Sequence, residues 1–162
     1  MKSPHSFIIR PVGGVKYSTE RAGIIMSAST EDARYTNRYA EVIETPIGYE
    51  GDIQIGDTII THHNVFRSIN NMLGKEELSA MHIDGENYFV DESMIYMYKN
   101  TEWKACYPYI FVKPVEKIQG FLLSTEHYEK QHGTIRFAPH ETIEIGQYIV
   151  FSPDSEYEFD VD

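Results

Sequence analysis

Cysteine is almost absent from this sequence of 162 residues, in which Cys106 is the single example. One thiol excludes an internal disulfide and a zinc site built from several cysteines. Long apolar runs are also missing. No stretch of 18 consecutive apolar residues is present to cross a membrane, and the first residues lack the apolar run of a signal peptide. We therefore expect a cytoplasmic protein that does not enter the membrane.

A surplus of positive charge is absent as well. The formal net charge is −11, and the halves 1–103 and 104–162 carry −6 and −5. No basic face is segregated that could bind phosphate backbones or anionic lipid. Nucleic acid and membranes are not expected as partners.

Helical periodicity is missing throughout the chain, whereas short β-rich runs bounded by Gly, Pro and Asp recur. Within the polar insertion Ser68–Met81, the stretch Lys75–Met81 has helical propensity and could form one turn. The sequence predicts an all-β protein, with strands at Ser6–Val12, Arg38–Glu44, on both sides of Gly56-Asp57 within Ile53–Thr61, around the hairpin turn Asp84-Gly85, and at Ser93–Tyr98.

Residue patterns for catalysis and metal binding are weak. Adjacent side chains on a strand point to opposite faces, so His62 and His63 would not chelate one ion well. Acidic pairs such as Asp91-Glu92 are interpreted as solvated surface, and no G-x-G-x-x-G turn stands between a strand and a helix. We expect no enzyme activity, no catalytic residue, no metal and no cofactor.

The stretch from Tyr17 to Asn37 stands out because an apolar triplet, Ile24-Ile25-Met26, lies within about twenty residues of Ser, Thr, Ala and charge. No period of 2.0 or 3.6 extends through this stretch, so it is not a core element along its whole length. One interpretation is a mobile loop whose triplet anchors a partner. The other is a short edge strand, Gly23 to Ser27, packed on its own domain.

The second half of the chain repeats the first in four blocks of the same order. The residue offset between the blocks falls from 103 to 97, 93 and 90, and each step lies between predicted strands. This indicates two copies of one small β-barrel with a boundary near Asn100 to Tyr107. The first-copy blocks begin at Ile8, Gly23, Ala40 and Ile53, and their counterparts begin at Phe111, Gly120, Gly133 and Ile143.

The second copy lacks an equivalent of the hairpin and of the closing strand Ser93–Tyr98. The chain stops at Tyr157-Glu158-Phe159-Asp160-Val161-Asp162. Three explanations stay open: a naturally short copy, a truncated chain, or a closing strand that another subunit supplies.

The order of the blocks resembles that of the GroES-type co-chaperonin family, and more closely its divergent phage and viral members. No single motif carries the resemblance, which spans Phe7 to Tyr98 well and Tyr109 to Asp162 more loosely. The resembling segments are IIRPVGG, GIIMS within a polar loop, RYAEVIETP, IQIGDTIITHHN and DGENYFVDESMIYMY.

The resemblance implies two tandem, partly open GroES-like β-barrels, the first over residues 1–100 with a mobile loop at 17–37, and the second, shortened, over 107–162. It implies a homo-oligomeric ring, expected to be a heptamer, that caps the folding chamber of a 60 kDa chaperonin, in the host cytoplasm if the chain is viral. ATP and ADP would bind to that chaperonin and not to this chain. The implied chaperonin-binding residues are Gly23, Ile24, Ile25, Met26 and Ser27, and a second anchor could lie at Phe121, Leu122 and Leu123.

Two features depart from the family pattern. The connection from Pro46 to Asp52 is shorter than the usual roof hairpin, and the insertion Ser68–Met81 has no counterpart in the simple bacterial form. The alternative function from a different class is a structural or scaffold protein, for example a virion component, built from duplicated small barrels. In that protein the Ile24 loop would be ordered in a permanent interface.

Overall fold

The computed structural model of the chain describes residues 2–15, 18–21, 24–27, 36–116, 128–140, 142–153 and 155. The chain divides into two compact units, Met1–Trp103 and Lys104–Asp162. In these ranges the regular structure consists of β-strands and two short 3-10 helices, without an α-helix. The prediction of an all-β protein is confirmed.

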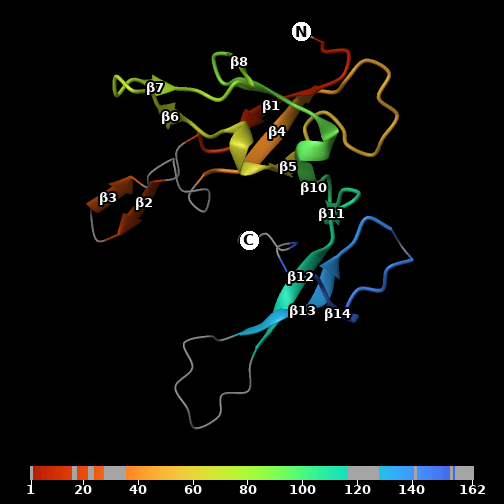
Figure 1. Cartoon of the computed structure of the whole chain (residues 1–162). Helices are drawn as coiled ribbons and strands as arrows, with labels where there is room; N and C mark the ends of the chain where they lie inside the picture. Colours follow the sequence, from red (N-terminus) through yellow and green to blue (C-terminus); the bar gives the residue numbers. More distant parts are fainter. Residues whose placement is uncertain are drawn as a thin grey trace. The chain divides into compact units, whose positions relative to one another are not determined.

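A seven-stranded sheet forms the framework of the first unit (Figure 1). Its strand order is β11-β10-β5-β4-β1-β9-β8, so strands from both ends of the unit are neighbours in the sheet. The strands are β1 (Phe7–Pro11), β4 (Tyr39–Glu44), β5 (Thr58–Thr61), β8 (His82–Asp84), β9 (Asn87–Val90), β10 (Ile95–Lys99) and β11 (Trp103–Ala105).

Strand β4 shows why these segments form strands. Ala40 and Val42 are fully buried while Glu41 between them is exposed, as the period of two in its sequence predicts. Glu41 lies opposite Arg10 of β1, which is also exposed, so the solvent side carries a cross-strand pair of opposite charge. The alternation therefore decides which face of the sheet is covered.

The core of the first unit consists of apolar and aromatic side chains from the sheet and from the short helix η2 (His63–Val65) with the residue that follows it. Phe66 meets Tyr88 edge to face at 4.9 Å, and Phe7 meets Tyr49 in the same way at 4.8 Å. The largest fully buried side chains of this unit are Tyr88, Phe7, Phe66, Ile9, Ile59, Ile60, Ile95, Met97, Val42, Val65 and Val90.

The sequence predicts a partly open barrel for the first unit, and the structure shows a sheet that is not closed into a barrel. The seven-stranded sheet is open, with β11 and β8 at its two edges, and no described strand joins them. Strand β8 has three residues, and its pairing with β9 is irregular between His82 and Asp84, so β8 offers little edge for closure. The hairpin turn at Asp84-Gly85 is as predicted, with Gly85 at φ +52°.

The insertion at Ser68–Met81 is a hairpin and not a helical turn. Strands β6 (Ile69–Asn70) and β7 (Glu76–Glu77) pair with each other. Asn71 closes their loop, because its Oδ1 accepts from the backbone N of Leu73 and of Lys75, each at 3.0 Å. Such hydrogen bonds from a side chain to the nearby backbone compete with the backbone hydrogen bonds of a helix, and helix propensity does not take them into account. A second 3-10 helix, η3 (Glu92–Met94), leads into β10.

The predicted strand before Gly56 is also absent, since residues 53–57 form a turn that leads into β5. Gly56 has φ +91°, and its N donates to Val42 O at 2.8 Å. Ile53 is buried even without a strand. Ile55, the next apolar residue of the alternation, is 60% exposed, so the alternation in this stretch reports neither strand pairing nor a buried face.

The Gly56 turn gives a stability prediction. A Cβ at Gly56 would meet nothing within 4 Å, so Gly56→Val should destabilise through its positive φ alone. The expected loss is roughly 1–2 kcal/mol or more, which corresponds to a melting temperature at least about 4 °C lower. Gln54→Val, at an exposed position of the same turn, is the control. Equal melting temperatures of the two variants would contradict this role of Gly56.

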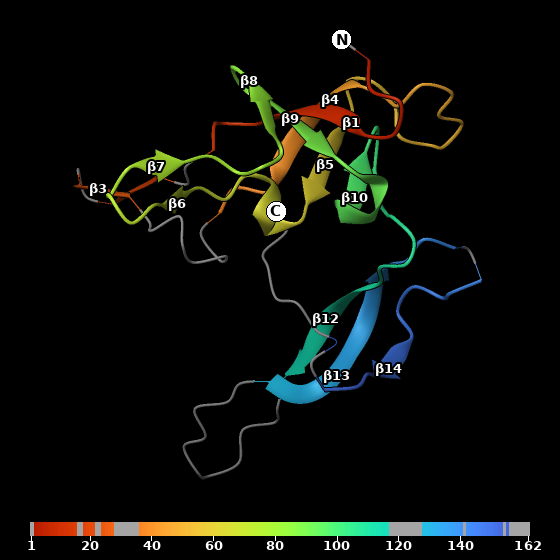
Figure 2. The same cartoon turned by 45° about the horizontal axis from the view of Figure 1, so that its top comes forward.

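The second unit has a three-stranded sheet of order β12-β13-β14 (Figure 2). Both pairings are antiparallel, and Ile135 in the middle strand is buried. The strands are β12 (Phe111–Glu116), β13 (Tyr128–Phe137) and β14 (Tyr148–Val150).

The three strands of the second unit pair in the same register as β1, β4 and β5 of the first. Ile9 is opposite Val42 in the first unit, and Val112 is opposite Ile135 in the second. Six further pairs follow with the sequence offsets of 103, 93 and 90, whereas Glu116–Tyr128 at the far end of β12 has no counterpart in the first unit. Ile8–Glu44, Arg10–Glu41, Pro11–Ala40, Tyr39–Ile60, Ala40–Ile59 and Glu41–Thr58 correspond to Phe111–Phe137, Lys113–Thr134, Pro114–Gly133, His132–Val150, Gly133–Ile149 and Thr134–Tyr148.

Irregular features are reproduced along with the regular pairing. Both sheets change register at the same position, between Ile8 and Ile9 and between Phe111 and Val112. Gly146 has φ +90°, and its N donates to Ile135 O at 2.8 Å, which matches the Gly56 turn in angle and in hydrogen bond. Shared bulges and turns are more specific than shared strands, because they depend on single residues.

Candidate functional site

The predicted anchor triplet lies on a strand that is separate from the main sheet. Strand β3 (Ile24–Ser27) pairs with β2 (Ser18–Arg21), in the register Ser18–Ser27, Thr19–Met26, Glu20–Ile25 and Arg21–Ile24. Among the described strands β3 has no other partner, so it is not an edge strand of the seven-stranded sheet. Gly23, the remaining predicted binding residue, lies outside the described residues.

Asn37 joins the two ends of the connection that carries this hairpin. Its Nδ2 donates to Val12 O at 2.8 Å and to Gly14 O at 2.6 Å, and its Oδ1 accepts from Tyr39 N at 3.0 Å. Val12 N in turn donates to Tyr39 O at 2.9 Å. The end of β1 and the start of β4 are therefore fixed to each other, and the hairpin of β2 and β3 lies between them in the chain.

The sequence analysis names Asn37 only as the last residue of the stretch from Tyr17 to Asn37 and gives it no role. A signal was available, because an Asn directly before a strand and opposite Gly13-Gly14 is typical of side-chain closure of a loop. Gly13 and Gly14 have φ +78° and +87°, so the backbone turns directly after β1. The side chain of Asn37 bonds to the chain at this turn.

The second predicted anchor occupies the corresponding connection of the second unit. Phe121, Leu122 and Leu123 lie between β12 and β13, the strands that correspond to β1 and β4, and they fall outside the described residues. The two apolar triplets thus share a place in the chain order, and the assignment of Phe121–Leu123 as an anchor stays a prediction.

His62 and His63 follow β5, where the sequence leads us to expect turn or interface histidines. Strand β5 ends at Thr61 and η2 begins at His63, so strand alternation does not apply, and the two rings stack at 4.1 Å. His62 Nδ1 accepts from Asn64 N at 3.1 Å. In the described part of the chain, no group of three or more His, Cys, Asp or Glu side chains is arranged to hold a metal ion.

The histidine pair should make stability depend on pH. Burial, with smaller contributions from His62, Arg38 and Arg67, lowers the pKa of His63 to about 4, against an ordinary value of 6.5. Between these values the unfolded chain binds a proton that the folded chain excludes, so the free energy of unfolding falls as the pH falls from about 6.5 to about 4. His63→Gln should show a smaller drop in melting temperature between pH 7 and pH 5 than the unmodified protein.

His5→Gln is the matched control for this measurement, because His5 is exposed and lies far from the stacked pair in the sequence. Both variants keep every carboxylate of the unmodified protein, so the comparison reports the effect of removing His63 from the stacked pair. An unchanged pH dependence in His63→Gln would contradict the effect of burial on this ring.

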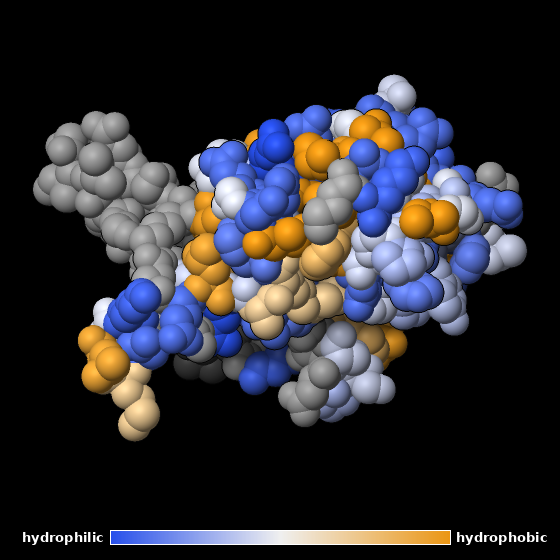
Figure 3. Space-filling model, turned by 90° about the horizontal axis from the view of Figure 1, so that it is seen from above, coloured by the Kyte–Doolittle hydropathy of each residue, from blue (hydrophilic) through white to orange (hydrophobic). Residues whose placement is uncertain are grey.

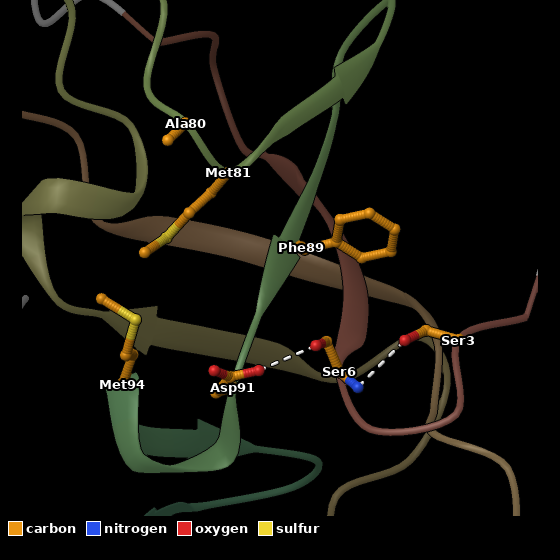
Figure 4. Close-up of a pocket in the computed structure, with 7 residues that line it drawn as sticks. All are labelled: Ser3, Ser6, Ala80, Met81, Phe89, Asp91 and Met94. Atoms are coloured by element: carbon orange, nitrogen blue, oxygen red, sulfur yellow. Dashed lines mark hydrogen bonds between the residues drawn. The ribbon is translucent and has the colours of Figure 1, made fainter.

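A hollow of about 230 Å³ lies beside β9 and the start of β1 (Figure 4). Met81 and Met94 extend toward each other on one side of it. On the polar side, Ser6 Oγ donates to the Asp91 carboxylate at 2.7 Å, and Ser6 N donates to Ser3 Oγ at 3.0 Å. Its polar groups hold the N-terminal segment against β9, so the hollow has a structural role and no acid–base pair is assembled in it.

Exposed apolar side chains are spread over several elements, and orange patches lie among hydrophilic ones on the face seen in Figure 3. In the first unit the most exposed are Met72 and Leu73, in the loop between β6 and β7, at 106% and 92%. These two residues lie next to Asn71, whose side chain closes that loop. They form an apolar loop tip in addition to the Ile24 hairpin, and sequence analysis missed it because the stretch around these residues is polar.

The described residues include no helix with the length and apolar character needed to cross a membrane. In the described part of the chain, the apolar triplet lies on a separate hairpin whose connection to the sheet is fixed at its base by Asn37, which is an arrangement with the features of a binding site. No family model, no curated protein and no solved structure matches this chain.

Proposed function

We propose that this chain is a co-chaperonin of the GroES type, which caps the folding chamber of a 60 kDa chaperonin and assists protein folding in a nucleotide-dependent cycle. The observation that carries the proposal is the placement of Ile24, Ile25 and Met26. They lie on a hairpin that pairs with no strand of the main sheet, within the connection between β1 and β4. A lid that binds by a projecting segment needs this arrangement.

The clamp at the base supports the same function. Ordering a loop costs on the order of 1–2 kcal/mol per residue fixed, and a loop that starts from a fixed base and a preformed hairpin has fewer residues to order. Asn37 supplies the fixed base through its bonds to Val12 and Gly14. The scaffold would then hold the segment in one place while the segment itself adapts to the partner.

We further propose that the chain carries two GroES-like domains, over 1–100 and 107–162, the second shortened. Support comes from the shared register of the two sheets, their shared bulge and the matching turns at Gly56 and Gly146. Duplication of one ancestral domain explains these correspondences together, because unrelated sheets would not share a bulge position and a glycine turn.

Binding would be weak for one chain and firm for a ring. Burial of one apolar side chain of the triplet contributes roughly 1.5–3 kcal/mol, which ordering of the loop largely offsets. A homo-oligomeric ring, here proposed as a heptamer, presents many segments at once and gains avidity through effective concentration. Each triplet would dock in an apolar groove of the chaperonin. If a change in nucleotide state weakens binding slightly at every groove, the whole ring is released.

The remaining features fit a cytoplasmic lid. ATP and ADP act on the chaperonin, and this chain needs no cofactor of its own. Its net charge of −11 disfavours retention of nucleic acid and of other acidic chains. The Ser- and Thr-rich flanks of the triplet keep an apolar segment soluble while it is unbound.

The test is size-exclusion chromatography of the full chain with a bacterial chaperonin, with ATP, with ADP and without nucleotide. Nucleotide-dependent co-elution is the expected result. A stable oligomer that ignores the chaperonin in every nucleotide state would overturn the proposal in favour of a structural or scaffold protein. Limited proteolysis adds a second readout, because cleavage within residues 17–37 should slow when chaperonin and nucleotide are added.

A further inference from the structure

In the described residues, no strand pairs with the outer edge of β14, whereas a strand pairs with its counterpart in the first unit. Strand β5, which corresponds to β14, pairs on that side with β10, in the register Met97–Ile60, Tyr98–Ile59 and Lys99–Thr58. In the described part of the second unit, β14 pairs with β13 and with no other strand. The result is visible in exposure: Ile60 is 0% exposed, whereas Val150 at the same place is 64% exposed.

The backbone of β14 is free to pair on this side. Ile149 lies opposite Gly133, flanked by hydrogen bonds from Ile135 N to Gln147 O and from Phe151 N to Gln131 O, each 3.0 Å. Because hydrogen-bonding directions alternate along a strand, the groups of Ile149 face β13, and the N–H and C=O of Tyr148 and Val150 face outward.

The two edges of this sheet differ in protection. Strand β12 carries Lys113, Pro114 and Glu116, all exposed, and charge and proline are the usual devices that keep an edge from pairing. The seven residues Ile145–Phe151 around β14 contain no charge and no proline, in a chain of net charge −11. Tyr148 is 54% exposed and Ile145 70% exposed. An uncharged, apolar, unprotected edge is one that a native protein covers.

We infer that β14 pairs with β14 of a second copy of this chain, antiparallel about a two-fold axis through Ile149. In this register Tyr148 of each copy lies opposite Val150 of the other, and their outward groups form four backbone hydrogen bonds. Relative to the first unit, the second copy's Tyr148, Ile149 and Val150 take the places of Met97, Tyr98 and Lys99.

A second copy fits better than an unrelated strand because this edge is self-complementary. Tyr148 and Val150, whose backbone groups face outward, are separated by one residue, so a two-fold axis through that residue pairs the N–H and C=O groups of both. The apolar side chains of one copy then lie opposite those of the other. The pairing uses the second unit alone and does not depend on chaperonin binding by the Ile24 segment.

Disulfide trapping tests the register in the full chain. Ile149 is at the axis and forms a pair without hydrogen bonds to itself, with Cα atoms about 4.5 Å apart, within the range a disulfide spans. In a Cys106→Ser background, Ile149→Cys should give a dimer on a non-reducing gel after mild oxidation. Each chain then has one cysteine and can form one disulfide, so the gel should show a dimer and no larger crosslinked species even if the chains form a ring through other surfaces.

Lys113→Cys in the same background is the matched control, because residue 113 is exposed on the opposite edge of the same sheet. It should give at least tenfold less dimer. Adding Val150→Lys to Ile149→Cys should suppress the crosslink, since a lysine on an edge strand opposes pairing. Equal crosslinking at 113 and 149, or no crosslinking at 149, would overturn the inference. Ile25→Asp should leave the crosslink intact, which separates this test from that of the proposed function.

Discussion

Replacing Ile25 by aspartate is expected to abolish co-elution with the chaperonin while leaving the fold unchanged. Ile25 lies on β3, opposite Glu20 of β2, in a hairpin that pairs with no strand of the main sheet. Docking of the triplet in an apolar groove would bury a carboxylate without a partner, which costs several kcal/mol for each chain. In a ring this penalty is repeated in every subunit, so no residual binding should be detected by size-exclusion chromatography.

Ile47→Asp is the matched control for this variant, because Ile47 is 64% exposed on the main body, outside the anchor segment. It should co-elute with the chaperonin as the unmodified protein does. Circular dichroism and the melting temperature should be the same for both variants and the parent. A lower melting temperature of Ile25→Asp with co-elution intact would show that the segment packs on its own domain and is not the anchor.

Replacing Phe66 by alanine is expected to have the largest effect on stability. Phe66 is 1% exposed, and it meets the 2% exposed ring of Tyr88 edge to face at 4.9 Å. Tyr88 lies on β9, which pairs with β1 in the seven-stranded sheet. Removal of a buried phenylalanine costs about 3–5 kcal/mol, a large share of the roughly 5–15 kcal/mol that stabilises a typical domain.

Urea unfolding followed by tryptophan fluorescence measures this effect on the first unit, since Trp103 is the single tryptophan and lies edge to face with Tyr39 at 6.2 Å. The urea midpoint should fall markedly in Phe66→Ala. Phe66→Leu, which keeps an apolar side chain of similar reach, should lose less than half as much. Identical midpoints for the alanine and leucine variants would show that the contact with Tyr88 is not what holds η2 on the sheet.

Strands with a period of two were predictable, because alternation encodes burial directly. Ala40 and Val42 of β4 and the turn at Gly85 were found from local pattern alone. The repeat was found in the same way, through apolar residues and glycines at constant offset, and the paired residues of β12, β13 and β14 follow those offsets.

Local pattern failed where hydrogen bonds from side chains decided the conformation. Asn71 closes a hairpin in a stretch whose composition favours a helix. Asn37 fixes the two ends of the connection that carries β2 and β3, which its position before a strand and opposite Gly13-Gly14 could have indicated.

The sequence by itself determined the all-β class, the absence of a disulfide and the two-fold internal repeat, since these depend on composition and on spacing along the chain. The tertiary structure decided that β3 stands apart from the main sheet, that the sheet stays open, and that β10 pairs with β5 while no described strand pairs with the outer edge of β14. The physical reason is that strand pairing and the burial of a strand edge depend on residues far apart in the chain. Ile60 and Met97, for example, lie opposite each other in the sheet but 37 positions apart in the sequence, so a local sequence pattern cannot predict their contact.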